Sequence, residues 1–191
     1  GYDRAMVYRF DEDESGEVIA EVVRPGLGSF LGQRYPAGDI PRQARTLYLR
    51  NWIRMIADVD GVPMPVLGQG ASQLDLSLAG LRAVSPIHLE YLRNMGVSAS
   101  LSVSIIIQGR LWGLLACHHY SPRRVGCRRR AAAELFGQVF ALVLQSRERA
   151  VVAMASGKGV EDIEKLVLQM HRNKRLTPSI VFRALCMGDV P

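Results

Sequence analysis

The apolar stretch RLWGLLACHHY at residues 110–120 constrains the fold more than any other segment of this chain. Turn-forming pairs bound it on both sides, at residues 108–109 and 121–122, and its length favours a buried strand over a helix. Because neighbouring residues of a strand point to opposite faces, only one of His118 and His119 faces whatever the sheet covers. That histidine is either a core residue or a ligand contact, and this stretch alone favours the core residue.

Composition is typical of a globular domain of one substantial core. The chain has 191 residues, of which 48% are hydrophobic, and its mean hydropathy is +0.06. No apolar run approaches the roughly 20 residues that cross a bilayer. The three cysteines have neither a metal-ligand spacing nor the even count of a disulfide framework. We therefore expect a cytoplasmic protein without a membrane span, a metal site or structural disulfides.

The net charge of +6 comes largely from two basic runs, at residues 123–130 and 171–175. Such runs usually cover a solvated turn or the start of a helix. No aromatic side chains interleave with them, although surfaces that bind single-stranded nucleic acid combine the two. Nucleic acid is therefore not an expected partner.

Alternating apolar residues predict two antiparallel hairpins. Residues 4–10 and 17–23 flank an acidic turn with a glycine, and residues 98–107 and 110–120 flank Gln108-Gly109. Before the second hairpin we expect an irregular segment at 29–41, a helix at 42–51, a strand at 52–58, a loop at 59–75 and a helical turn at 76–81. A helix from Pro86 to Met95 follows, which Ser85 caps and Gly96 ends. After the second hairpin we expect a long helix at 128–152 and a helical signal within 157–191. This order predicts an α+β fold, an antiparallel sheet flanked by helices with a long C-terminal helix.

Polar residues on two of these strands suit an anionic or polar ligand. Arg54 shares a strand face with Trp52 and Ile56, and an arginine in apolar surroundings is expected to pair with an anion. Within residues 98–107, Ser98, Ser100, Ser102 and Ser104 alternate with small or apolar residues, which places a row of hydroxyls beside one histidine of the neighbouring strand. A surface ion pair and an ordinary solvated sheet face are the open alternatives.

The segment PAGDIP also has the features of a ligand-binding loop. Pro36 and Pro41 fix the local backbone, and Gly38 permits a turn that other residues would resist. A loop stiffened in this way can present the backbone carbonyl of Asp39 to a ligand. It is also an ordinary way to enter the following helix.

Five segments in series carry a family resemblance. They are YDRAMVYRF, SGEVIAE, RYPAGDIPRQARTLY, LRAVSPIHLEYLRNMGVSASLSVSI and LWGLLACHH. Over roughly residues 1–150 the chain resembles the chromophore-binding GAF domain of phytochromes, most closely that of bacteriophytochromes. The resemblance implies binding of a linear tetrapyrrole (biliverdin in most bacterial members) and sensing of red and far-red light through isomerisation of its D ring.

Particular residues receive roles from this resemblance. Asp39 is implied to accept pyrrole N–H groups on its carbonyl, His88 to hold a pyrrole water, and His118, rather than His119, to lie near the D-ring carbonyl. Arg54 and Arg82 are implied to bind the propionates. The full set of implied bilin-binding residues is Tyr8, Tyr35, Asp39, Ile40, Pro41, Tyr48, Arg54, Arg82, Ser85, His88, Tyr91, Ser100, Ser102 and His118.

Three departures from the family pattern bear on pigment attachment and on the neighbouring domains. Gly38 stands where the motif usually has serine, and Ile87 stands where plant and most cyanobacterial members have the attachment cysteine. Cys117 is expected on the sheet face opposite His118, so no attachment cysteine is expected in this chain. The tail from about Gly157 does not visibly match the PHY domain that should follow.

The resemblance also implies partners. We expect a PAS domain upstream of a truncated N-terminus, a helical extension at 151–191 that starts a PHY domain or linker, and a homodimer formed through helix 128–152. The output would be an activity such as that of a histidine kinase, with no catalysis in this chain. The alternative function is a pigment-free GAF sensor that responds to redox state or a small ligand, which the three cysteines allow.

Overall fold

The computed structural model describes residues 1–155, and the helical signal expected within residues 157–191 lies outside them. The described chain contains an antiparallel sheet with the strand order β3-β2-β1-β6-β5-β4. Its strands are β1 (Arg4–Phe10), β2 (Gly16–Val23), β3 (Arg34–Tyr35), β4 (Ile53–Ile56), β5 (Ala99–Ile107) and β6 (Arg110–His119). The predicted α+β class is confirmed.

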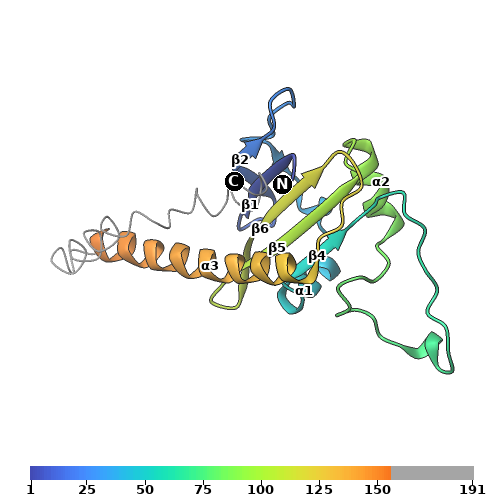
Figure 1. Cartoon of the computed structure of the whole chain (residues 1–191). Helices are drawn as coiled ribbons and strands as arrows, with labels where there is room; N and C mark the ends of the chain where they lie inside the picture. The colour runs from blue at the N-terminus through green and yellow to red at the C-terminus, as the bar shows by residue number, and fades with distance from the viewer. Residues whose placement is uncertain (156–191) are drawn as a thin grey trace.

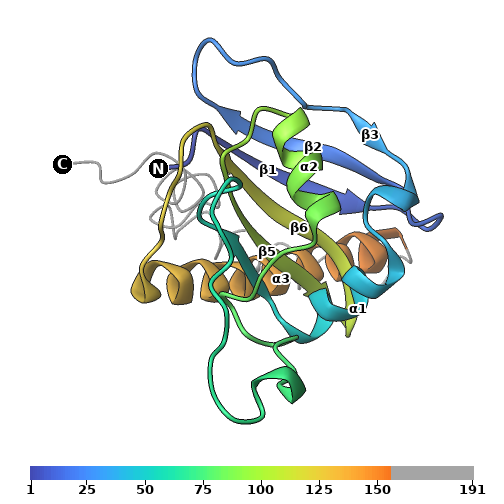
Figure 2. The same ribbon diagram turned by 90° about the vertical axis from the view of Figure 1, so that its right-hand side faces the viewer.

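Helices lie on both faces of this sheet (Figures 1 and 2). The long helix α3 (Cys127–Ala155) runs along one face, which we call the α3 face. The short helices α1 (Arg42–Arg50) and α2 (Pro86–Asn94) lie over the other, which we call the pocket face. The expected helices at 42–51, at 86–95 and at 128–152 are therefore present.

Alternation along the strands separates the residues of the two faces. On the α3 face the buried side chains are almost all apolar, and they are Ala5, Val7, Leu101, Val103, Ile105, Leu115 and Cys117. On the pocket face the central strands contribute Met6, Tyr8, Leu114, Ala116 and His118. Burial on both sides explains why residues 110–120 read as a dense apolar run instead of a simple alternation.

Backbone geometry agrees with the predicted turn at Gln108-Gly109. Gln108 has a φ of 50° and Gly109 a φ of 75°, the pair of positive angles that a tight two-residue hairpin turn requires. Gly96 has a φ of 69° directly after α2, so it ends that helix in the left-handed conformation that glycine adopts most readily. The turn at Gln108-Gly109 connects β5 and β6 directly, whereas Gly96 ends α2 ahead of β5.

Several local predictions are wrong. The segment expected to be irregular contains β3 and a short 3₁₀ turn, η1 (Ala37–Asp39), while residues 76–81 form turns without a helix, and the nearby helical turn is η2 (Ala71–Gln73). Gly38 has no left-handed φ and a Cβ there would meet no atom within 4 Å, so its turn does not require glycine. Ser85 is at the N-cap of α2 but makes no side-chain capping hydrogen bond.

Among residues 1–155, no helix combines the length and the apolar character that a membrane span needs. In the same part of the chain, His, Cys, Asp and Glu side chains form no group of three that could hold a metal ion.

Candidate ligand-binding site

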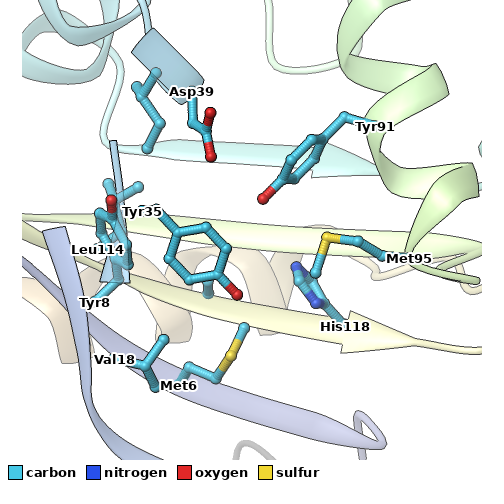
Figure 3. A pocket seen from close by; sticks show the side chains of 11 residues that line it. Met6, Tyr8, Val18, Tyr35, Asp39, Tyr91, Met95, Leu114 and His118 are labelled. Atoms are coloured by element: carbon cyan, nitrogen blue, oxygen red, sulfur yellow. The ribbon is translucent and has the colours of Figure 1, made fainter. Parts of the chain in front are cut away.

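A pocket opens on the pocket face, between the sheet, the segment around η1 and helix α2 (Figure 3). Its cavity volume is about 100 Å³, and the pocket is open to solvent on one side. The residues that line it are Met6, Tyr8, Val18, Tyr35, Asp39, Ile40, Tyr91, Met95, Leu114, Ala116 and His118. Six of the predicted site residues are thus brought together, namely Tyr8, Tyr35, Asp39, Ile40, Tyr91 and His118.

Side chains from four separate parts of the chain converge on this space. Figure 3 shows Tyr35, Asp39, Tyr91 and His118 pointing towards it from β3, η1, α2 and β6. The walls between them are apolar, so a ligand would exchange water for hydrocarbon contacts over most of its surface. The polar groups are few and fix its orientation.

His118 is the most deeply buried titratable group of the pocket. It is 7% exposed, and its Nδ1 has no hydrogen-bond partner within the described part of the chain. Burial, together with the nearby charges of Arg4 and His88, lowers its pKa to about 4. At neutral pH this imidazole is uncharged and retains an unused polar nitrogen for a ligand.

The three pocket tyrosines keep their phenolic protons over the same pH range. Burial raises the pKa of Tyr8 and of Tyr91 to about 12, and it also raises the pKa of Tyr35. The Tyr35 hydroxyl donates a hydrogen bond to Gln33 Oε1 at 2.9 Å. Each phenol can therefore donate or accept a hydrogen bond without carrying charge.

A second polar group is built around Arg54 on β4. Its Nε donates to Ser102 Oγ at 3.0 Å, and its Nη1 donates to Ser104 Oγ at 3.0 Å and to the Asn51 carbonyl at 2.9 Å. The guanidinium also lies over the Tyr48 ring, 3.6 Å from its centroid. These contacts hold the planar fork in one orientation.

One nitrogen of this fork is left without a partner. Nη2 of Arg54 is buried and has no hydrogen-bond partner, and neither Arg54 nor Arg82 forms an ion pair with any other described residue. Burial and the nearby Arg82 charge lower the pKa of Arg54 to about 10, which still leaves the group cationic at neutral pH. A buried, unpaired cation of this kind favours an anionic ligand.

His88 lies on α2, near both Arg54 and His118. Its ring stacks on Tyr91 with centroids 6.3 Å apart. Although the residue is exposed, partial desolvation and the Arg54 charge lower its pKa. The predicted residues that do not line the pocket are Pro41, Tyr48, Arg54, Arg82, Ser85, His88, Ser100 and Ser102.

The residues outside the lining are not equivalent. Ser100 is buried beside His118 in the sheet register, whereas Ser85 is exposed at the start of α2. Nη1 of Arg82 donates to the Ala79 carbonyl at 3.3 Å within its own loop. Pro41 accepts the first backbone hydrogen bonds of α1 on its carbonyl. The structure therefore groups Arg54, Ser102 and Tyr48 closely, while Ser85, Arg82 and Pro41 make no hydrogen bond with that group in the described chain.

The comparison with known families settles what kind of domain carries this pocket. The profile of the GAF domain matches residues 1–146. The chain belongs to the GAF domain family. This GAF domain is similar to the bacteriophytochrome of Pseudomonas aeruginosa, with 52% identity over 157 residues, and to that of Xanthomonas campestris, with 44% identity over 190 residues.

These relatives are much longer proteins. The match covers 80% of this chain and 22% of the Pseudomonas protein, and 95% of this chain and 29% of the Xanthomonas protein. The GAF domain therefore spans less than a third of the length of either relative, and the rest of each relative has no counterpart in the match.

Solved chromophore-binding domains share its fold. That of Stigmatella aurantiaca phytochrome P1 gives a TM-score of 0.69 at 47% identity, over 75% of this chain and 48% of that one. That of an unusual bacteriophytochrome from R. palustris gives 0.72 at 43% identity, over 78% and 51%. This GAF domain is thus similar to the GAF domains of phytochromes in sequence and in structure.

Sequence reasoning missed the apolar lining of the GAF pocket. The additional lining residues are Met6, Val18, Met95, Leu114 and Ala116. Strand alternation could have found Met6 from Tyr8, and Leu114 and Ala116 from His118. Met95 and Val18 carry no such signal, because their approach depends on how α2 and β2 are placed in three dimensions.

A buried ion pair beside the pocket was also missed. Arg4 lies opposite His118 in the β1–β6 register and pairs with the Glu21 carboxylate. Nη2 of Arg4 donates to the Gly28 carbonyl at 2.6 Å, and Glu21 accepts the Phe30 N–H at 3.1 Å. The pair therefore fastens the loop that follows β2 and places a fixed positive charge near the pocket histidine.

Proposed function

We propose that this GAF domain is the pigment-binding part of a red and far-red light receptor, and that its pigment is a linear tetrapyrrole, biliverdin. The observation that carries the proposal is the unpaired, buried Nη2 of Arg54 on the same sheet face as a largely apolar pocket. A linear tetrapyrrole combines a long apolar π system with two propionate groups. Its shape and charge match a site that is hydrocarbon-lined at one end and cationic at the other.

The residues present would contact the propionates, the pyrroles and the D ring of such a pigment. Arg54 and Arg82 would bind the propionates, assisted by the hydroxyls of Tyr48, Ser85, Ser100 and Ser102. Asp39, Ile40 and Pro41 would form the wall that faces the pyrroles. The neutral His118 and the phenols of Tyr8, Tyr35 and Tyr91 would surround the D ring, while His88 would hold a pyrrole water. The bound pigment would supply the absorption of red light and the isomerisation of its D ring.

No cysteine of the described chain lines the pocket. Cys117 is buried on the α3 face, Cys127 starts α3, and position 87 is isoleucine. We therefore propose that this chain by itself binds biliverdin without a covalent bond. After acid denaturation, the pigment should separate from the polypeptide on a sizing column. Co-elution of pigment and denatured chain would contradict this part of the proposal.

Addition of biliverdin to the purified chain tests the main proposal. A red absorbance band, shifted from that of free biliverdin, should appear and should change reversibly under red and far-red light. An absent band would overturn the proposal. A pigment-free protein whose behaviour changes on thiol oxidation would instead support the redox-sensor alternative.

The outer side of α3 supports the expected homodimer. Leu135, Val139 and Leu142 are 59%, 48% and 65% exposed there and recur at helical spacing. We propose that two copies pair through these side chains, and that α3 passes the light signal to a PHY domain and to an output such as a histidine kinase. Analytical ultracentrifugation of the chain should detect a dimer, and a strictly monomeric chain at high concentration would contradict the pairing.

A further inference from the structure

The guanidinium of Arg45 on α1 is bonded to three backbone carbonyls from two separate segments. Its Nε donates to the Ile40 carbonyl at 2.8 Å, and its Nη2 donates to those of Ala37 and Glu14 at 3.2 and 2.6 Å. A charged donor makes stronger hydrogen bonds with carbonyls than a neutral one does. One side chain therefore joins the segment around η1 to the turn between β1 and β2.

Packing on an aromatic ring holds the Arg45 guanidinium in one orientation. The Arg45 guanidinium lies over the Phe10 ring, 4.4 Å from its centroid. Phe10 ends β1, and Glu14 in the adjoining turn has a φ of 65°. The segment around η1 is thus attached to the central sheet through the β1–β2 turn, as well as to its own helix. A lysine could supply the charge but neither the fork nor the stacking plane.

The segment held by Arg45 is a wall of the pocket. Asp39 and Ile40 line the pocket, and the two carbonyls that Arg45 takes from this segment, those of Ala37 and Ile40, flank Gly38 and Asp39. Within η1, the Asp39 N–H donates to the Pro36 carbonyl at 3.1 Å. With these two carbonyls turned towards Arg45, the orientation of the peptide units between them is restricted.

Gly38 makes this restriction necessary. Glycine loses more conformational freedom on ordering than any other residue, yet the backbone at Gly38 is not left-handed and open space surrounds the position of a Cβ. The order of the wall at this point therefore has to come from contacts made by its neighbours. Arg45 makes three such contacts at once.

We propose that Arg45 is the positioning residue of the pocket wall. It sets the backbone orientation of residues 37–40 before any ligand enters and couples that wall to the β1–β2 turn. This role concerns the pigment-free chain, so it stands or falls independently of the proposed function. If biliverdin binds, Arg45 also lowers the entropy that binding removes from this wall.

Hydrogen exchange of the pigment-free chain tests the proposal. In Arg45→Met, the amides of residues 37–40 should exchange about tenfold faster, since that factor corresponds to the loss of roughly one hydrogen bond's worth of protection. Arg45→Lys should show an intermediate rate. Arg42→Met and Arg50→Met, at exposed arginines of the same helix with no hydrogen bond to residues 37–40 among those found, should leave these rates unchanged.

Two controls keep the result interpretable if Arg45→Met destabilises the whole domain: exchange at the β5 amides and a second substitution at Gly38. The β5 amides report on global opening, so any destabilisation of the whole domain is measured there, and exchange at residues 37–40 should accelerate more than exchange at β5. Adding Gly38→Ala to Arg45→Met should slow exchange of the wall several-fold, because alanine restricts the unfolded backbone at a compatible position.

Three results would overturn the proposal. They are unchanged exchange at residues 37–40 in Arg45→Met, an equal acceleration in Arg42→Met, and acceleration at β5 as large as that at the wall. With biliverdin present, Arg45→Met should bind more slowly than the parent chain, and Gly38→Ala should restore part of the rate. Failure of pigment binding in every variant would contradict the proposed function and leave the exchange result to decide the role of Arg45.

Discussion

The α3 face and the pocket face of the sheet come from the same strands and differ in one respect, the completeness of their cover. A single long helix covers the α3 face, where Val103 and Ile105 are fully buried. Two short helices and a loop cover the pocket face, where buried nitrogens of Arg4, Arg54 and His118 have no hydrogen-bond partner among residues 1–155. On the α3 face the corresponding atoms, of Tyr2 and His119, lie at the end of the sheet where the chain begins, away from the pocket. The contrast indicates that the α3 face provides stability, whereas the pocket face gives up some of it to keep polar groups available for a ligand.

Matched truncations on the two faces should show the largest difference. Ile105→Ala on the α3 face is expected to lower the free energy of unfolding by about 3–4 kcal/mol, because a close-packed site cannot collapse around the cavity. Leu114→Ala, which removes a side chain of the same size from the pocket wall, should lower it by about 2 kcal/mol or less. Urea unfolding of the pigment-free chain measures both, and equal losses would refute the comparison.

Acid should destabilise the pocket face through His118. The folded-state pKa of about 4 lies below the value of 6.5 for the unfolded chain, so the unfolded state takes up this proton first. The resulting contribution, on the order of 3 kcal/mol, is fully present above pH 6.5 and is lost as the pH falls towards 4.

Substitution of His118 isolates this contribution from that of the carboxylates. Plots of unfolding free energy against pH should be flatter between pH 6.5 and 4 for His118→Phe than for the parent chain. His119→Phe, on the α3 face, should have a smaller effect, because the Asp3 carboxylate, 2.7 Å from Nδ1, offsets part of the lowering of the His119 pKa by burial. A larger flattening in His119→Phe would show that the two histidines have the opposite roles.

Arg54 should separate ligand binding from stability. Arg54→Met removes an unpaired buried cation, so the free energy of unfolding of the pigment-free chain should change by about 1 kcal/mol or less. Biliverdin affinity should fall by about 10- to 100-fold, the loss of one charged hydrogen-bonding group. Titration of absorbance measures the affinity, and Arg50→Met is the control that should leave it unchanged.

The smallest effect on folding is expected on the outer side of α3. Leu142→Ser should change the free energy of unfolding of the monomer by about 0.5 kcal/mol or less, while it weakens self-association. Ala141→Ser, at the buried neighbour of Leu142, should destabilise the monomer more and affect self-association less. The reverse order in sedimentation and urea experiments would place the contact surface elsewhere.

Much of this architecture could be predicted from the sequence because alternation is a local signal. It gave both hairpins and placed His118 and His119 on opposite faces, and the turn at Gln108-Gly109 has the dihedral angles that such a turn needs. Strand β3 escaped prediction because two residues carry no periodicity. Its formation depends on pairing with β2, a contact that no local pattern encodes.

The candidate site was less accessible to the same reasoning. The family resemblance named Asp39 and Arg54, whose roles as pigment contacts stay predictions, but it did not name Arg45 or Arg4. Both of these arginines act on backbone carbonyls, of Ile40 and of Gly28 respectively. Every residue has a backbone carbonyl, so the sequence does not indicate which carbonyl an arginine side chain will bind.

The position of β1 beside β6 has a consequence for how the pocket forms during synthesis. Arg4 pairs with His118 and Arg9 with Gly113, so the first strand of the chain needs the sixth as its neighbour. Such non-local pairing slows folding, and at typical rates of elongation the ribosome releases β6 on the order of ten seconds after β1. During that interval the tyrosine side of the pocket exists without its histidine side. Pigment capture by a nascent chain should therefore begin only after residue 119 has emerged.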